Sequence, residues 1–457
     1  MSAVESTETA AVFEPHNTRV DTNIKAFRLC RVFLRRYQVW IGTASALTLA
    51  LASWAACCGY ASLLPLAVAI LIPIIMKARE PAVYCVDHQE FFAPKSWEVS
   101  HEDVISIMST HPNVTEESKD FARRVLTHSG IGSGSALPPN LIKSLRTGEP
   151  WSANMADARE EMEFILTDII QGLLDKTGVK PQQIDFLVLN CSFFNPTPSL
   201  SAMVSHKFGF RSDCLSYNLS GMGCSANGIS MDLGRRLLEH APLGSLCVVV
   251  SAESYARQFY SGNERSRVMS NVLFRNGATA ALLTNWNSGN CKYELLDTVR
   301  AQVVKDEAIE AAWQGSDKEG LLSLCLNKSI VPVAGEALML NLEQLLPRMS
   351  RLPKFLRYFS RSARLAPSDL PNVVDFFCIH AGGRAVIDNI MEVLNLTEKD
   401  VNPSRESLSR HGNTMSTSVW YEMGILEKTG KLRPGDSVLQ IALGSGFKCN
   451  TALWLCL

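Results

Sequence analysis

An internal repeat most constrains how this chain of 457 residues can fold. The segments Val179–Val188 and Leu370–Cys378 each lead through an Asp-Phe pair into a run of apolar residues, 190 positions apart. The segments 244–250 and 435–441 also match, because each begins at a glycine turn and continues as a strand pattern, 191 positions apart. Two matches at nearly the same offset indicate a structural unit that is present twice.

The matched runs show no regular alternation of polar and apolar residues, which is typical of strands buried on both faces. A third pair of strand patterns follows, at Ala278–Thr284 in the first half and Asn450–Cys456 in the second. Helical patterns separate the strands at 158–176, 225–240 and 416–429. We therefore expect an α/β fold of two pseudo-symmetric halves, in which helices cover a mixed sheet.

The halves differ in an insertion at about 252–276, which the second half lacks. A long insertion on a duplicated scaffold favours a role in binding or dimerisation, although a surface loop without a role is the alternative. Two further segments, at about 303–335 and 345–371, have no counterpart. Basic and aromatic residues between Lys354 and Arg364 suggest a cap or a membrane-facing surface there.

The N-terminal region holds no Asp, Glu, Lys or Arg from Tyr37 to Met76. Because one transmembrane helix takes about 20 apolar residues, this run predicts two spans, at about 38–56 and 61–76, joined by a turn. A buried helical hairpin of a soluble core is the alternative. Basic residues flank both outer ends and none lies in the turn, so both ends should face the cytosol, with residues 1–36 as a tail with a basic flank.

Charge and cysteine content exclude several classes of function. The chain has 44 Lys and Arg against 45 Asp and Glu, so nothing indicates a nucleic-acid-binding surface. Its 13 cysteines form no CxxC pair and no zinc-like spacing, which indicates a reducing compartment without a disulfide framework or a structural metal.

Cys224 is the strongest candidate nucleophile. It lies in the glycine-rich turn Ser220–Gly228, which leads into a helical pattern. A thiol at a helix N-terminus experiences the positive end of the helix dipole, so we expect a lowered pKa and a reactive thiolate.

The repeat brings two more residues into consideration. Asn413 lies 189 positions after Cys224, so the pseudo-symmetry places its polar turn opposite the thiol. His380 ends the matched strand of the second half. A lone histidine after a buried strand is more often a core residue, but here three groups converge. Cys, His and Asn without a carboxylate suit attack on a thioester and stabilisation of an enolate. Cysteine proteases use the same residue types on a different scaffold.

At these residues the chain resembles the plant-type 3-ketoacyl-CoA synthases, the condensing enzymes of very-long-chain fatty acid elongation in the thiolase superfamily. The resemblance extends from about residue 83 to the C-terminus. Such enzymes also carry two N-terminal membrane spans, which agrees with the two spans predicted above. The motifs that carry it are Asn190–Val204, Ser220–Gly228, Gly262–Ser266, Leu273–Arg275, Cys378–Asp388, Gly412–Thr414 and Gly444–Asn450.

This resemblance implies a fold and a division of roles. The fold would be a layered αβαβα arrangement of the chalcone synthase type, with halves at 83–300 and 301–457. Cys224 would take the acyl chain, while His380 and Asn413 would bind malonyl-CoA and stabilise its enolate. Backbone N–H groups of Cys224 and Ser445 would form an oxyanion hole, with Gly444 and Gly446 binding substrate. No metal or redox cofactor is implied.

The chain departs from the family pattern at three positions. Phe376 and Ser409 stand where the family has His, and His411 stands where Phe is usual. We therefore expect these extra family histidines to be dispensable. His411 should serve in packing or in orienting the turn that presents Asn413.

The resemblance also implies partners and a location. We expect acyl-CoA and malonyl-CoA as substrates, a homodimer, and association with the reductase and dehydratase of fatty acid elongation. The location would be the endoplasmic reticulum membrane, with the catalytic domain facing the cytosol. The alternatives are a type III polyketide synthase, a catalytically silent membrane scaffold and a thioesterase.

Overall fold

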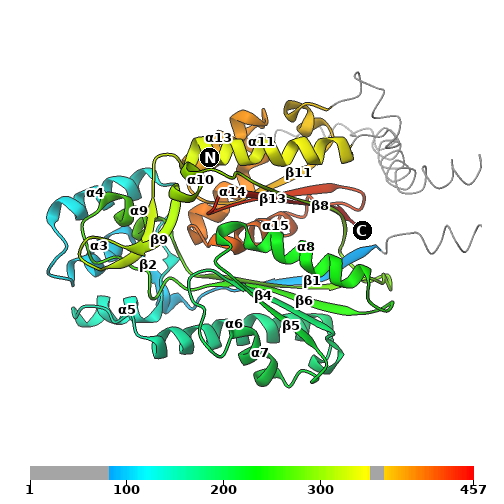
Figure 1. The fold of residues 1–457 in the computed structure, drawn as a ribbon, viewed down its shortest axis with the longest axis horizontal. Coiled ribbons are helices and arrows are strands. Elements are labelled where there is room, and N and C mark those ends of the chain that lie inside the picture. Colours follow the sequence, from blue (N-terminus) through cyan, green and yellow to red (C-terminus); the bar gives the residue numbers. More distant parts are fainter. Residues whose placement is uncertain (1–81, 350–364) are drawn as a thin grey trace, which may run out of the picture. The chain divides into compact units, whose positions relative to one another are not determined.

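The computed structural model describes residues 82–349 and 365–457, shown as the coloured ribbon in Figure 1. A nine-stranded mixed sheet runs through them in the order β11-β12-β13-β8-β1-β7-β6-β4-β5. Its strands are β1 (Val83–Glu90), β4 (Phe186–Cys191), β5 (Leu215–Ser220), β6 (Leu246–Glu253), β7 (Gly277–Thr284), β8 (Tyr293–Gln302), β11 (Phe376–Ile379), β12 (Ser437–Gly444) and β13 (Lys448–Cys456).

The strand order confirms the predicted repeat. From the middle of the sheet outward, one side is β1, β7, β6, β4 and the other is β8, β13, β12, β11. On both sides the second and third strands pair antiparallel and the third and fourth pair parallel. The sides join where Val83–Cys85 of β1 pairs antiparallel with β8, and the predicted division at residue 300 falls within β8. The first half has an additional edge strand, β5.

Helices form three layers around the strands, as Figure 1 shows. Helices α8 (Ala226–Glu239) and α15 (Ser418–Lys428) lie between the strands of the two halves and contact both. The outer helices are α6 (Met155–Thr177) and α7 (Leu200–Phe208) on the first half, and α11 (Ile330–Met349), α13 (Arg384–Val393) and α14 (Glu398–His411) on the second. The predicted layers and the predicted helices at 158–176, 225–240 and 416–429 are therefore confirmed.

Burial explains why α8 and α15 occupy the central layer. Every residue of α15 from Ser418 to Leu426 is buried, as expected for a helix covered on all sides. Helix α8 begins against β13, because Gly228 has no side chain. A Cβ there would lie only 2.6 Å from the Cβ of Asn450. The first turn of α8, which follows Cys224, is thus held directly against the second half.

A smaller group of elements covers one end of the layers. It comprises α3 (His101–Ser109), α4 (Glu116–His128), α5 (Pro139–Thr147), α9 (Arg265–Leu273), α10 (Asp306–Glu310), β9 (Ala312–Ser316) and β10 (Leu322–Leu326), with the short strands β2 (Glu98–Val99) and β3 (Ser135–Ala136). The predicted insertion at 252–276 supplies α9 and a loop with buried Tyr255, Phe259 and Tyr260. It is part of a core rather than a free surface loop.

The predicted membrane spans at 38–56 and 61–76 lie outside the described residues, as does the basic stretch from Lys354 to Arg364. In residues 82–349 and 365–457, no helix combines the length and apolar composition that crossing a membrane requires.

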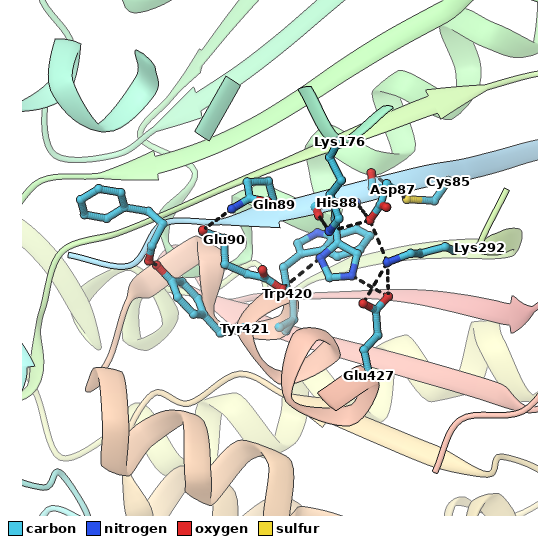
Figure 2. A network of polar contacts seen from close by, with 12 residues as sticks. Cys85, Asp87, His88, Gln89, Glu90, Lys176, Lys292, Trp420, Tyr421 and Glu427 are labelled. Atoms are coloured by element: carbon cyan, nitrogen blue, oxygen red, sulfur yellow. Dashed lines mark hydrogen bonds and ion pairs between the residues drawn. The ribbon is translucent and has the colours of Figure 1, made fainter. Parts of the chain in front are cut away.

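A partly buried polar network around the buried His88 ties β1 to α15 (Figure 2). The His88 ring lies 3.1 Å from both Glu90 and Glu427, and Lys292 pairs with Glu427 and Asp87. Burial alone would lower the pKa of His88, but the hydrogen bond to Glu427 and the close carboxylate of Glu90 more than offset it and raise the pKa. This network fixes the position of α15 against β1.

Candidate active site

A cavity of about 810 Å³ lies where the two halves meet the smaller group of elements. Cys224, His380 and Asn413, which come from three separate segments, all line it. Gly444 and Ser445 line it as well, whereas Gly446 does not. Gly446 instead takes a left-handed conformation with φ +67°, which turns the chain between β12 and β13.

Cys224 lies in the 3₁₀ turn Gly223–Ser225, directly before α8. The left-handed conformation of Gly223, with φ +67°, produces the turn that the glycine bracket predicts. Of the described cysteines, Cys224 and Cys214 are partly exposed and the others are buried. Cys224 lines the cavity, whereas Cys214 does not.

The predicted lowering of the Cys224 pKa is wrong. Burial of the thiol, with the nearby Glu253 carboxylate as the second cause, raises its pKa to about 12. The helix N-terminus is in the predicted place, but loss of hydration of the thiolate outweighs it. At neutral pH the resting thiol is protonated, so it must lose its proton as it attacks.

Two backbone segments approach each other closely beside Cys224. A Cβ at Gly444 would lie 2.5 Å from Ser225 N and 3.0 Å from Cys224 N, and one at Gly223 would lie 2.7 Å from Ser445 N. Only glycine allows this approach. It brings the N–H groups of Cys224 and Ser445 to one wall of the cavity, as a backbone oxyanion hole requires.

His380 directly follows β11, and its backbone N–H donates to Ile441 O at 2.9 Å. The residue is 4% exposed, and its Nδ1 lies 2.8 Å from Ser418 Oγ. Burial lowers the pKa of His380 to about 4, so the imidazole is neutral at physiological pH. The predicted position at the end of a buried strand, facing the cavity, is confirmed.

Asn413 is held through its backbone and its side chain. Its backbone pairs with the first half, since Asn413 N donates to Leu273 O and Arg275 N donates to Asn413 O, both at 3.0 Å. Its Oδ1 accepts Met415 N at 2.9 Å, and its Nδ2 donates to Gly382 O at 3.1 Å. One proton of Nδ2 stays free for a ligand.

Met415 has a left-handed backbone with φ +59°, which costs energy for a residue with a Cβ. This strained conformation aims its N–H at the Asn413 amide oxygen. His380 and Asn413 therefore present neutral polar groups that surrounding bonds orient in advance, as stabilisation of an oxyanion or enolate requires.

Glu253 is a cavity-lining residue that the sequence reasoning missed. It ends β6 and is fully buried. Its Oε2 accepts Ser192 N at 2.9 Å, and its Oε1 accepts Ser416 Oγ at 3.1 Å. Burial raises its pKa to about 7, and the hydrogen bonds reduce that rise. In the sequence, Glu253 could have been recognised as the single acidic residue that ends the uncharged run Leu246–Ala252.

The rest of the cavity is largely apolar and has a basic group of residues. Apolar side chains come from α4, α9, β9, β10 and α11, among them Phe121, Met269, Leu324 and Ile330. The cationic side chains are Arg124, Arg265 and Arg384. Because Arg265 and Met269 belong to the predicted insertion, the insertion forms part of the binding cavity. Such a lining suits a ligand with a long hydrocarbon chain and an anionic end.

His411 does not line the cavity. Its ring packs between Tyr421, with centroids 4.7 Å apart, and Phe92, at 5.9 Å. Burial, and then the charges of Arg410 and Lys428, lower its pKa to about 4.

In the part of the chain that the structure describes, no three His, Cys, Asp or Glu side chains are arranged to hold a metal ion.

Two family models match consecutive parts of the chain. The model described as FAE1/type III polyketide synthase-like protein matches residues 75–364. The model described as 3-oxoacyl-(acyl-carrier-protein) synthase III C terminal matches residues 363–456.

Curated relatives include 3-ketoacyl-CoA synthase 11 of Arabidopsis thaliana, which is 39% identical over 84% of this chain and 77% of that protein. Another, 3-ketoacyl-CoA synthase 17 of the same plant, is 37% identical over 84% and 80%. Among solved structures, PKS-I from the brown alga Ectocarpus siliculosus has a TM-score of 0.68 at 16% identity, covering 82% of this chain and 99% of that one. CsyB complexed with CoA-SH has a TM-score of 0.69 at 18% identity, with coverages of 82% and 100%. The chain shares the fold of these two structures.

Proposed function

This chain belongs to the 3-ketoacyl-CoA synthases, and from that membership we propose how its cavity carries out their reaction. The reaction is the decarboxylative Claisen condensation of a long-chain acyl-CoA with malonyl-CoA, which gives a 3-ketoacyl-CoA, CoA and CO₂. It is the first step of very-long-chain fatty acid elongation. The observation that carries the proposal is that Cys224, His380 and Asn413 line one largely apolar cavity.

In the first half-reaction, Cys224 attacks the acyl-CoA thioester. The S–H bond breaks as the new C–S bond forms, the bond to the CoA sulfur breaks, and the proton leaves with CoA. The N–H groups of Cys224 and Ser445 stabilise the oxyanion of the tetrahedral intermediate. The close approach that Gly223 and Gly444 permit supports this role.

In the second half-reaction, malonyl-CoA loses CO₂ and its thioester oxygen becomes an enolate. The Asn413 amide and the His380 imidazole donate hydrogen bonds to that oxygen. The enolate carbon then attacks the acyl-Cys224 thioester, the new C–C bond forms as the C–S bond to Cys224 breaks, and the departing thiolate takes up a proton from solvent to regenerate the thiol. Both donors are neutral, and hydrogen bonds orient them before substrate binds. Such preorganised donors suit stabilisation of the enolate oxygen.

Separate measurement of the two half-reactions tests these roles. Cys224→Ala should abolish acyl-enzyme formation from labelled acyl-CoA, with Cys214→Ala as the matched control, because Cys214 is partly exposed outside the cavity. Asn413→Ala should still acylate but should fail to condense. An Asn413→Ala enzyme that condenses at the wild-type rate would exclude the role proposed for it.

Product analysis separates the alternatives. A type III polyketide synthase would extend the chain repeatedly without reduction, a thioesterase would release a free acid, and a silent scaffold would give no acyl-enzyme. With one acyl-CoA and labelled malonyl-CoA, we expect a single 3-ketoacyl-CoA that is two carbons longer.

We also propose that residues 37–76 anchor the chain in the endoplasmic reticulum membrane, with the catalytic domain facing the cytosol. The uncharged run between basic flanks supports this. The sequons at Asn113 and Asn395 offer a test, because both asparagines are exposed. They should remain unglycosylated in intact cells, and a glycan on either would place the domain in the lumen.

A homodimer is proposed as well, together with association with the reductase and dehydratase of elongation. The strand β5 lies at an edge of the sheet, and its Leu215 is 53% exposed. An exposed edge strand can pair with a second copy of the chain. A monomer by light scattering in detergent would argue against this interface.

A further inference from the structure

Ser418 is a buried hydroxyl at the first position of α15 that takes no part in the chemistry proposed above. The residue is 1% exposed. Its Oγ lies 2.8 Å from His380 Nδ1 and 3.4 Å from Met415 O. A serine hydroxyl has one proton to donate, so only one of these two atoms can receive it.

The proposed role of His380 as a donor to the enolate oxygen identifies Nδ1 as the acceptor. In the reverse arrangement, Nδ1–H donates to Ser418 Oγ and Ser418 donates to Met415 O, which would leave Nε2 without a proton. A separation of 2.8 Å is ordinary for a good hydrogen bond, whereas 3.4 Å to Met415 O is near the limit. If Ser418 donates to Nδ1, that nitrogen must carry a lone pair. The His380 imidazole is neutral because burial lowers its pKa to about 4, so it has one ring proton. That proton is then on Nε2.

Nε2 faces the space that a glycine leaves open. A Cβ at Gly382 would lie 3.1 Å from both Nε2 and Cδ2 of His380. Gly382 and His380 both line the cavity, and the Asn413 amide bonds to Gly382 O. The Nε2–H group therefore points to the side on which a thioester oxygen would meet both donors.

We infer that Ser418 is a positioning residue that keeps His380 in the Nε2–H tautomer, so that the ring presents a donor to the enolate oxygen of malonyl-CoA. The inference rests on the proposed function, because it takes stabilisation of that oxygen as the task of His380. In the other tautomer a lone pair on Nε2 would face the enolate oxygen and repel it. Both tautomers have the same charge and nearly the same shape, so only a hydrogen-bond partner can select between them.

A second link between α15 and β11 keeps Ser418 and His380 in place. Ile379 N donates to Ser404 Oγ at 3.0 Å, and Ser404 Oγ donates to Glu422 Oε2 at 2.8 Å. Glu422 lies one turn after Ser418 on the same face of α15. The end of β11 is thus fixed without the Ser418 hydroxyl. Its removal should change the tautomer more than the position of the ring.

The test compares Ser418→Ala with Ser418→Thr in the full-length enzyme. Thr417→Val is the matched control, because Thr417 is a buried hydroxyl of the same turn that donates to Thr414 O instead. Ser418→Ala should lower kcat for condensation by about 10- to 100-fold, which is the scale of loss when a metal-bound histidine loses the partner that orients it. The KM for malonyl-CoA and the rate of Cys224 acylation should stay unchanged. Ser418→Thr, which keeps the hydroxyl, should recover most of the rate.

His380→Ala in the same assays separates the two possible failures. If it loses condensation while Ser418→Ala behaves like Thr417→Val, the inference about Ser418 is wrong and the proposed function stands. If His380→Ala condenses normally, the proposed function itself is wrong. A Ser418→Ala enzyme that loses acylation and condensation equally would show that Ser418 has a merely structural role. A Ser418→Thr enzyme that condenses no faster than Ser418→Ala would show the same.

Discussion

His380 and His411 lie in the same half of the molecule and differ in almost everything except their pKa. Burial lowers both pKa values to about 4. His380 lines the cavity and has Ser418 Oγ on Nδ1. His411 ends α14, lies outside the cavity and packs between the rings of Phe92 and Tyr421.

The difference shows that a depressed pKa alone does not mark a functional histidine. Any imidazole that is removed from water without a carboxylate partner becomes easier to deprotonate. Function depends on which atoms surround the ring. A polar partner on one nitrogen and open space at the other allow a substrate to bind, whereas two aromatic faces leave the ring as packing material. His88 adds a third case, in which two carboxylates raise the pKa of a buried ring.

Of the changes considered for these two histidines, replacement of His380 should have the largest effect on condensation. His380→Ala should lower the condensation rate by about 10²–10³-fold or more, the usual result of removing a main donor to a developing oxyanion. Acylation of Cys224 should remain. Labelled malonyl-CoA gives decarboxylation and ketoacyl-CoA formation in one assay, and wild-type rates for both would show that His380 is not a donor.

The next largest effect is expected from a change in the turn between His411 and Asn413. Gly412, which follows His411, has φ +70°, and a Cβ there would lie 2.5 Å from Cγ of the buried Arg275. Gly412→Ala should destabilise the fold by about 1–3 kcal/mol and displace Asn413. We expect condensation to fall roughly tenfold or more, since small displacements of positioned groups are costly. Thermal unfolding measures the first effect and the condensation assay the second. Unchanged values in both would show that the turn is adaptable.

A smaller effect is expected when His411 itself is changed. His411→Phe keeps an aromatic ring between Phe92 and Tyr421, so condensation should stay within about threefold of wild type, because such pair contacts are worth only about 0.5–1.5 kcal/mol. Expression level and circular dichroism control for folding. If His411→Phe is inactive and His380→Ala is active, the two roles are reversed.

The smallest expected effect is on acid stability. The pKa of His411 is about 4 in the folded chain and about 6.5 when unfolded, so between these values the unfolded state binds the extra proton. The stability that neutral His411 contributes is therefore present above pH 6.5 and lost as the pH falls toward 4. In this window the free energy of unfolding of His411→Phe should fall less steeply as the pH is lowered. The difference in slope should correspond to about one bound proton. Denaturant unfolding at several pH values measures it, and parallel curves would contradict the assignment.

Several features of this protein follow from the sequence alone. The repeat predicts the duplicated sheet, since strands buried on both faces need continuous apolar runs wherever they occur. The glycine bracket around Cys224 predicts its turn, because a left-handed backbone at Gly223 restricts the residue type. The repeat also brings in His380, at the end of a matched strand, and Asn413, whose polar turn it places opposite Cys224.

Other features depend on the tertiary structure, because burial and partners come from segments far apart in the chain. The thiol of Cys224 has a raised pKa because the packed halves remove water and bring Glu253 near, which outweighs the local helix end. Ser418 is one of several hydroxyls in its turn, and only packing of α15 against β11 places it on His380. Local sequence thus determines backbone conformation and periodicity, whereas hydration, charge proximity and the hydrogen-bond partner of a side chain are decided when distant segments pack together.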